Sequence, residues 1–137
     1  MRSTMLLLVC AFSLAGQDVV FRGIPDLRVF ATTERDDREK LDAATAQKNE
    51  CVIVQRGKKY FWASRDDAPL TRVDAPQFTY FIHNGGAGYV KVFTGSRVEA
   101  NAPADYVENI NRGFEVITYW GRANTVRAEP VRATPSK

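Results

Sequence analysis

Histidine and cysteine are scarce in this chain, and their scarcity excludes several kinds of chemistry. The 137 residues contain one histidine, His83, and two cysteines, Cys10 and Cys51. A tetrahedral metal site takes four nitrogen, sulfur or carboxylate ligands, which so few histidines and cysteines do not supply. We therefore predict that the protein holds no metal ion. In addition, no family-specific signature of a cysteine protease surrounds Cys51.

Charge of one sign is also limited. Lysine and arginine number 19 against 16 acidic residues, so the net charge is only +3. Nucleic-acid-binding domains usually concentrate lysine and arginine on one face, whereas these charges are spread along the chain in clusters of mixed sign. The densest basic cluster, Arg56-Gly57-Lys58-Lys59, has the composition of a solvated turn. We expect no nucleic-acid partner.

The one long apolar run lies at the N-terminus. Arg2 precedes an apolar run over residues 5–14, broken only by Ser13, and Ala15 and Gly16 follow. This is the pattern of a secretory signal peptide, and cleavage after Ala15 places small residues at positions −3 and −1. The run is shorter than the ~20 apolar residues that span a bilayer, so no stable membrane anchor is expected after cleavage. We predict a periplasmic or extracellular protein. The alternative is that the apolar run is not a signal peptide but a buried N-terminal strand or helix.

Removal of the signal peptide, residues 1–16, also removes Cys10. The mature chain then contains a single cysteine, Cys51, and no internal disulfide is possible. The remaining length suffices for one hydrophobic core, so we predict a single globular domain over residues 17–127. Residues 128–137 are poor in large apolar side chains and predict a flexible C-terminal tail.

The local patterns predict an α+β fold. Acidic residues at capping-box spacing predict a helix over residues 35–48, and Pro103 before an apolar stripe predicts a second helix over residues 104–111. Residues 17–32 have the character of an irregular lead-in, with one short strand as an alternative for part of it. Strands are expected over residues 51–54, 60–63, 77–83, 89–93 and 114–120, and residues 70–73 are a candidate for a further short strand. We therefore predict one domain with a four- to five-stranded, mainly antiparallel sheet and two helices.

The glycine-rich segment Asn84-Gly85-Gly86-Ala87-Gly88 is typical of a hairpin turn. Asn-Gly and Gly-Gly accept the positive φ angles of tight hairpins. A phosphate-binding loop instead leads from a strand into a helix and carries a Lys-Ser/Thr pair. Over residues 89–93 the two faces of a strand alternate, so a strand follows the loop and no helix does. We therefore predict that this segment binds no nucleotide, and we predict no other cofactor.

Cys51 and His83 form the one conceivable nucleophile–base pair of the mature chain. They would be adjacent if the strand beginning at Cys51 lay beside the strand ending at His83. The competing interpretation makes Cys51 a packing residue, because it opens an apolar strand and no basic cluster flanks it. We favour packing, and a thiol-dependent hydrolase or transferase remains the alternative function.

Alternation along the strands divides the large side chains between two faces. One face carries Phe61, Phe78, Tyr80 and Ile82, and the other carries Tyr60, Trp62, Phe81 and His83. If the first set faces the core, the second set forms an aromatic surface, and such surfaces bind sugars, peptides or partner proteins. We expect a helix to cover this surface; an open platform is the alternative.

Arg65 follows the aromatic strand and precedes Asp66 and Asp67. These charged residues either stabilise a turn or bind a ligand, and aspartate is found more often in turns. If the aromatic surface is open and Arg65 binds a ligand, the ligand-binding candidates are Tyr60, Trp62, Arg65 and Phe81.

Three segments together resemble a family of uncharacterised small exported bacterial proteins with the pattern YWASR … GxGYV+V … TYYG. They are Tyr60-Phe61-Trp62-Ala63-Ser64-Arg65, Gly86-Ala87-Gly88-Tyr89-Val90-Lys91-Val92 and Ile117-Thr118-Tyr119-Trp120-Gly121. The resemblance covers about residues 50–122 and implies a bacterial envelope location and one compact domain, but no catalytic residue. Because catalytic residue types are also few, we predict a non-catalytic binding or interaction module of the cell envelope. Its partner would be a protein or small molecule of unknown identity.

The signal peptide is tested by sequencing the N-terminus of the mature protein. We expect it to begin at Gly16 or Gln17, because cleavage after Ala15 or Gly16 follows the small-residue rule. Recovery of soluble cytoplasmic protein that still begins with Met1 would contradict export.

Overall fold

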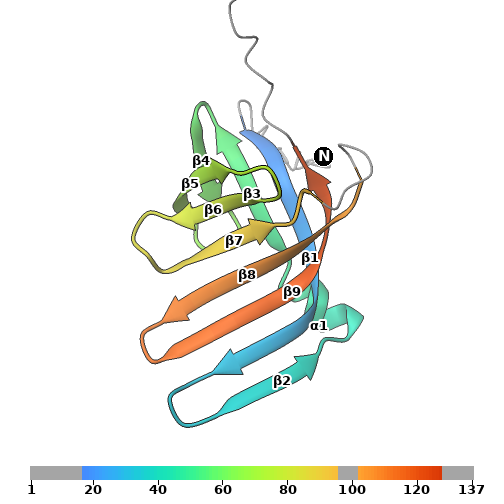
Figure 1. The fold of residues 1–137 in the computed structure, drawn as a ribbon, viewed down its shortest axis with the longest axis vertical. Coiled ribbons are helices and arrows are strands. Elements are labelled where there is room, and N and C mark those ends of the chain that lie inside the picture. The colour runs from blue at the N-terminus through green and yellow to red at the C-terminus, as the bar shows by residue number, and fades with distance from the viewer. Residues whose placement is uncertain (1–16, 96–101, 128–137) are drawn as a thin grey trace, which may run out of the picture.

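The computed structural model describes residues 17–95 and 102–127, and it is almost entirely β structure (Figure 1). The elements are β1 (Gln17–Ala31), β2 (Asp36–Lys40), α1 (Ala43–Lys48), β3 (Cys51–Arg56), β4 (Lys59–Trp62), β5 (Ala68–Asp74), β6 (Thr79–His83), β7 (Gly88–Val92), β8 (Ala104–Arg112) and β9 (Glu115–Val126). The predicted signal peptide, residues 1–16, and the predicted tail, residues 128–137, lie outside the described residues.

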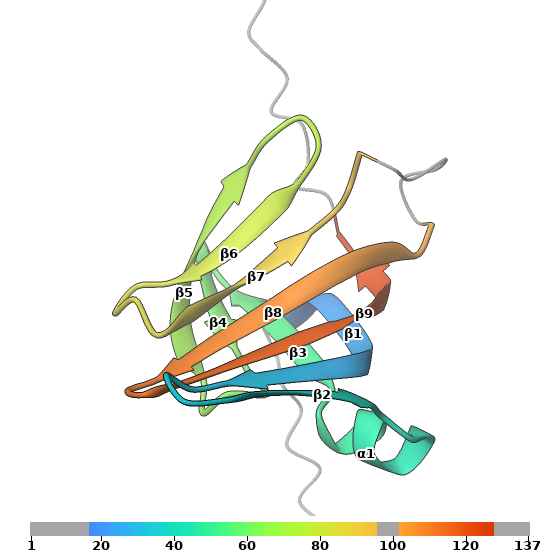
Figure 2. The same cartoon turned by 60° about the horizontal axis from the view of Figure 1, so that its bottom comes forward.

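Eight of the strands form a closed antiparallel barrel. From β3 to β9, each strand pairs with the next one along the chain. β1 pairs with β3 on one side and with β9 on the other, and the β1–β9 pairing closes the sheet. β2 pairs with the C-terminal part of β1 and extends the sheet beyond the ring, close to α1 (Figure 2).

The predicted α+β fold with two helices is therefore wrong. Residues 104–111 lie in β8, because pairing with β7 and β9 satisfies their backbone groups and alternation buries Tyr106 and Ile110. The same apolar residues also fit one side of a short helix, and tertiary pairing decides between the two. Residues 35–48 are divided between β2 and α1, where the Asp42 side chain accepts a hydrogen bond from the Thr45 N–H at 2.7 Å.

The predicted irregular lead-in, residues 17–32, is instead contained almost wholly in the longest strand, β1. Gly23 and Pro25 suggested an interruption, but the strand continues past both. Its register against β9 shifts between Arg22 and Gly23 and again between Pro25 and Leu27. Such bulges accommodate glycine and proline in a strand and bend it, which helps β1 to contact both β3 and β9.

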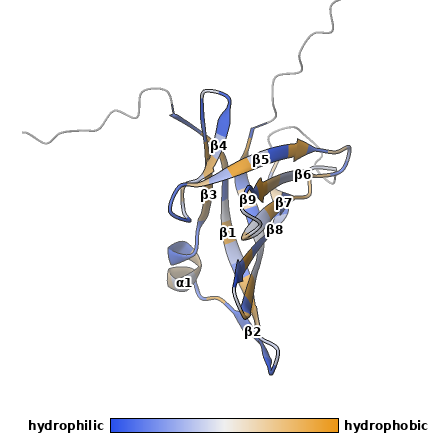
Figure 3. Ribbon diagram, turned by 90° about the vertical axis from the view of Figure 1, so that its left-hand side faces the viewer, coloured by the Kyte–Doolittle hydropathy of each residue, from blue (hydrophilic) through white to orange (hydrophobic). Residues whose placement is uncertain are grey.

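Both predicted hairpins are confirmed, as β3–β4 and β6–β7. Hydrophobic and hydrophilic residues are interspersed along the strands (Figure 3), as alternation between two faces requires. The predicted division into two sets also holds, but the enclosed set is the opposite one: Tyr60, Trp62 and Phe81 are buried, whereas Ile82 is 41% exposed. The closed sheet itself covers the aromatic surface, and no helix within the described residues does.

The interior of the barrel is filled by aromatic and aliphatic side chains. The rings of Phe21 and Tyr106 meet edge to face at 5.1 Å, and those of Tyr60 and Phe81 do so at 5.6 Å. In the part of the chain that the structure describes, no helix is long and apolar enough to cross a membrane.

Barrel closure brings the backbones of β1 and β9 into close approach at Gly121. A Cβ atom built on Gly121 would lie 2.2 Å from the carbonyl oxygen of Ile24 and 2.6 Å from Cα of Pro25. Both atoms belong to the backbone, so they do not move aside as a flexible side chain would.

We expect Gly121→Ala to lower the free energy of unfolding by about 1–3 kcal/mol or more, because the added methyl group overlaps β1. Urea denaturation measures the change. Arg122→Ala is the matched control, since the Arg122 side chain is 72% exposed, and surface substitutions usually change stability by less than about 0.5 kcal/mol. Equal stability of the two variants would show that β1 and β9 do not approach as described.

Candidate functional site

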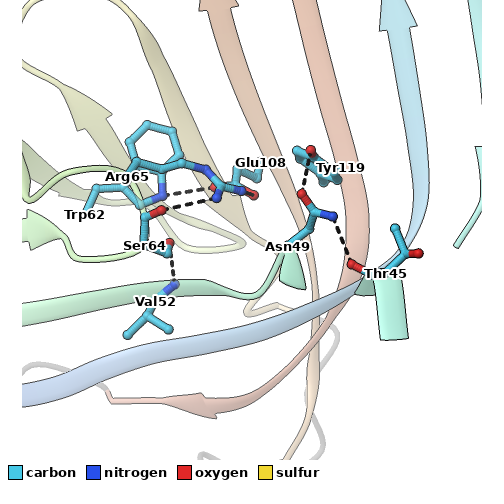
Figure 4. Close-up of polar contacts among 8 residues, drawn as sticks. All are labelled: Thr45, Asn49, Val52, Trp62, Ser64, Arg65, Glu108 and Tyr119. Carbon is cyan, nitrogen blue, oxygen red and sulfur yellow. Dashed lines mark hydrogen bonds and ion pairs between the residues drawn. The ribbon is translucent and has the colours of Figure 1, made fainter. Parts of the chain in front are cut away.

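The first candidate site is a buried carboxylate inside the barrel. Glu108 on β8 points inward and its side chain is 0% exposed. Its Oε1 accepts a hydrogen bond from the Trp62 indole N–H at 3.0 Å, and its Oε2 accepts one from the Arg65 guanidinium at 2.9 Å (Figure 4). Each carboxylate oxygen thus has a donor, as a buried charge requires.

The turn between β4 and β5 directs Arg65 toward Glu108. The Arg65 backbone N–H donates to the Trp62 carbonyl at 2.9 Å. The backbone N–H of Val52 on β3 donates to Ser64 Oγ, also at 2.9 Å. Asp66 and Asp67 follow with φ angles of 54° and 55°. This left-handed conformation is uncommon for residues other than glycine. The tight turn holds Arg65 at the end of the barrel, where its side chain remains 20% exposed.

A second set of contacts connects this cluster to α1. The guanidinium of Arg65 lies 5.6 Å from the ring centre of Tyr119. The Tyr119 hydroxyl donates to Asn49 Oδ1 at 2.9 Å, and Asn49 Nδ2 donates to the Thr45 carbonyl at 2.8 Å (Figure 4). The C-terminal end of α1 is therefore tied to the same end of the barrel as the ion pair.

Cys51 lies beside Glu108 in this interior and is fully buried. Burial raises the pKa of the Cys51 thiol well above its usual value, and the neighbouring Glu108 raises it further. The thiol therefore stays protonated at neutral pH, whereas a cysteine nucleophile reacts as the thiolate. Burial also raises the pKa of Glu108, although Arg65 opposes this effect.

Two buried polar atoms of the cluster have no hydrogen-bond partner within residues 17–95 and 102–127, namely Arg65 Nε and the Tyr106 hydroxyl. Burial also raises the pKa of Tyr106, which keeps its hydroxyl protonated. In the same described residues, no group of three or more histidine, cysteine, aspartate or glutamate side chains is placed to hold a metal ion. The chemistry of this cluster is that of a buried ion pair.

The structure does not place Cys51 and His83 on neighbouring strands. β3 and β6 are separated in the sheet by β4 and β5. His83 Nδ1 accepts hydrogen bonds from the N–H groups of Gly85 and Ala87 at 3.2 and 3.1 Å, within its own turn. Cys51 and His83 are therefore not arranged as a thiol–imidazole pair requires.

All four sequence-predicted ligand candidates lie at the barrel interior. Trp62 and Arg65 meet at Glu108, while Tyr60 and Phe81 pack against each other in the core. Glu108 itself was missed because residues 104–111 were predicted to be a helix. Recognising that segment as a strand would have placed Glu108 on the buried face, between Tyr106 and Ile110.

The second candidate site is a groove of about 580 Å³ on the outside of the barrel. Its lining includes four aromatic residues, Phe78, Phe93, Trp120 and the buried Tyr106, and four polar residues, Asp26, Gln77, Asp105 and Arg122. These residues lie in or next to β6, β7, β8, β9 and β1, which are successive neighbours in the closed sheet. The groove therefore runs across the strands.

The aromatic side of the groove is organised around Lys91 of β7. Its ammonium nitrogen lies 4.2 Å from the ring centre of Phe78 and 5.0 Å from that of Phe93. Cation–π attraction at these distances holds both rings near one point. Trp120 on β9 faces outward and is 45% exposed, so the groove presents an accessible indole.

The polar side of the groove carries weakly engaged groups. Asp105 Oδ1 lies 3.4 Å from Arg122 Nε, and the two side chains are 68% and 72% exposed. In the described parts of the chain, neither the Asp26 carboxylate nor the Gln77 amide forms a hydrogen bond or ion pair. These groups are available to a ligand, whereas those of Glu108 are enclosed.

We expect Glu108→Gln to lower the free energy of unfolding by about 3 kcal/mol, near the lower end of the cost of breaking a buried ion pair. An amide has one accepting oxygen, whereas both neighbours, Trp62 and Arg65, donate. Urea denaturation measures the loss. Glu39→Gln is the matched control, because it breaks the solvent-exposed pair with Arg28, which is worth at most about 1 kcal/mol. Similar losses in both variants would show that Glu108 is not enclosed.

We expect the Cys51 thiol to react slowly with a thiol reagent in the folded protein and rapidly in urea, because it is buried and protonated. Cys51→Ala should change stability modestly. Rapid labelling of the native protein, at a rate controlled by a group titrating near the ~6.5 of a histidine, would contradict this expectation and support a thiol–imidazole pair.

Comparisons of the chain with models of protein families, with curated proteins and with solved structures found no match.

Proposed function

We propose that this domain is a non-catalytic binding module of the bacterial cell envelope, and that its ligand occupies the outer groove. The supporting observation is the groove itself: about 580 Å³, with the rings of Phe78, Phe93 and Trp120 and accessible polar groups along it. Sites for small molecules are typically about 300–1,000 Å³, mostly apolar, with a few placed polar groups.

The interior supports a ligand less well. Tyr60, Trp62 and Phe81 are between 1% and 6% exposed and pack in the core. An eight-stranded barrel has an interior just wide enough for side chains to fill, and in this barrel large aromatic residues fill it. The ion pair between Glu108 and Arg65 stabilises one end of that core.

The geometry does not favour the thiol-dependent alternative. Its nucleophile, Cys51, is buried and protonated, and its base, His83, accepts hydrogen bonds within its own turn. The envelope location rests on the signal-peptide pattern of residues 1–16 and on the family resemblance.

The two tryptophans provide a test that does not depend on ligand class. Trp120 lines the groove, whereas the indole N–H of Trp62 is bonded to Glu108 in the interior. In a fragment screen by ¹H–¹⁵N NMR, we expect bound fragments to shift the indole resonance of Trp120 and not that of Trp62. Trp120→Ala should abolish their binding.

Phe114→Ala is the matched control, because Phe114 is 88% exposed and does not line the groove. It should leave fragment binding unchanged. Fragments that shift Trp62 instead would place the site in the interior. A screen in which no fragment binds at the groove would also overturn the proposal.

A further inference from the structure

We infer that the ligand of the outer groove is a neutral oligosaccharide, an inference that rests on the proposed function. Sugar rings present apolar C–H faces and edges of hydroxyl groups, so their sites combine exposed aromatic rings with polar planar side chains. The groove has both kinds of residue: Trp120, Phe78 and Phe93 on the aromatic side, and Asp26 and Gln77 on the polar side.

The polar groups match the hydrogen bonding of hydroxyls. A hydroxyl both donates and accepts, so it needs acceptors and donors side by side. The carboxylates of Asp26 and Asp105 accept, the guanidinium of Arg122 donates, and the Gln77 amide does both. Because the Asp105–Arg122 pair is long, at 3.4 Å, and exposed, solvent screens it. Ligand hydroxyls can replace it at little cost.

The charge balance of the groove favours a neutral ligand. Two acidic residues, Asp26 and Asp105, and one basic residue, Arg122, line it, and a second basic residue, Lys91, adjoins the lining through its contacts with the rings of Phe78 and Phe93. An anionic polymer would meet the two carboxylates, a cationic one would meet the Arg122 guanidinium and the charge of the adjoining Lys91, and like-charge contacts disfavour binding. An uncharged polyhydroxylated ligand meets neither penalty.

The shape favours a chain of sugars over a single ring. The lining residues span four inter-strand spacings, from β6 to β1. Neighbouring strands lie about 4.8 Å apart, so the groove extends over roughly 19 Å along the curved sheet. Over that span, an extended oligomer contacts more of the lining residues than a single ring does.

The test titrates the mature protein with two neutral probes, chitohexaose and cellohexaose, and follows both tryptophan indole resonances by NMR. We expect at least one hexamer to produce a saturable shift of Trp120 and no shift of Trp62. The corresponding monosaccharide should bind at least tenfold more weakly, because it contacts only part of the groove. An equal affinity for monosaccharide and hexamer would overturn the extended-chain inference.

Trp120→Ala and Asp26→Ala should each weaken hexamer binding about tenfold or more, the effect of removing a central contact. Phe114→Ala and Asp36→Ala are their matched controls, since both residues are exposed and lie outside the groove. They should bind as the unmodified chain does. If Trp120→Ala fails to fold, Asp26→Ala and the indole shifts still decide the question.

The outcomes separate this inference from the proposed function. If fragments shift Trp120 but neither hexamer does, the groove binds ligands and the oligosaccharide inference is wrong. Binding of an uncharged hexapeptide such as hexaalanine at Trp120, with no binding of either hexamer, would identify a peptide site and also overturn the inference. If neither fragments nor hexamers bind, both proposals fail.

Discussion

Closure of the sheet between β1 and β9 is the constraint on which the rest of the structure depends. The pairing runs from Phe21 to Ala31 on one strand and from Val116 to Val126 on the other. Because β1 pairs with both β3 and β9, neither of these two strands is left as an unpaired edge of the sheet. It also encloses every inward side chain, and this enclosure buries the aromatic core and removes Glu108 from water.

The enclosed carboxylate in turn imposes order on the end of the barrel. A buried charge is tolerated only with hydrogen-bonding partners, and Trp62 and Arg65 supply them. Arg65 directly precedes the two residues of the turn that lie in the left-handed region, Asp66 and Asp67. Backbone strain of this kind persists only where the surrounding contacts determine it. The strained turn and the carboxylate on β8 are thus connected through Arg65.

Filling the interior leaves the outside of the barrel as the surface available for recognition. The outward residues of β6 to β9 and β1 are not uniformly polar, since Phe78, Phe93 and Trp120 lie along one groove beside carboxylate, amide and guanidinium groups. Lys91 positions two of these rings through contacts that are already present without a ligand. A closed sheet with an outer groove whose aromatic rings are already in position is suited to binding.

Local chemistry in the sequence determined the hairpins β3–β4 and β6–β7, because glycine-containing turns and period-two alternation act over a few residues. Tertiary structure decided the rest. Residues 104–111 fit a helix and a strand equally well until β7 and β9 pair with them. Alternation separated Tyr60, Trp62 and Phe81 from their neighbours, but the side that becomes the interior depends on the direction in which the sheet curves. The contact of Glu108 with Arg65 and the groove across five strands join residues distant in sequence, and only closure of the sheet brings them together.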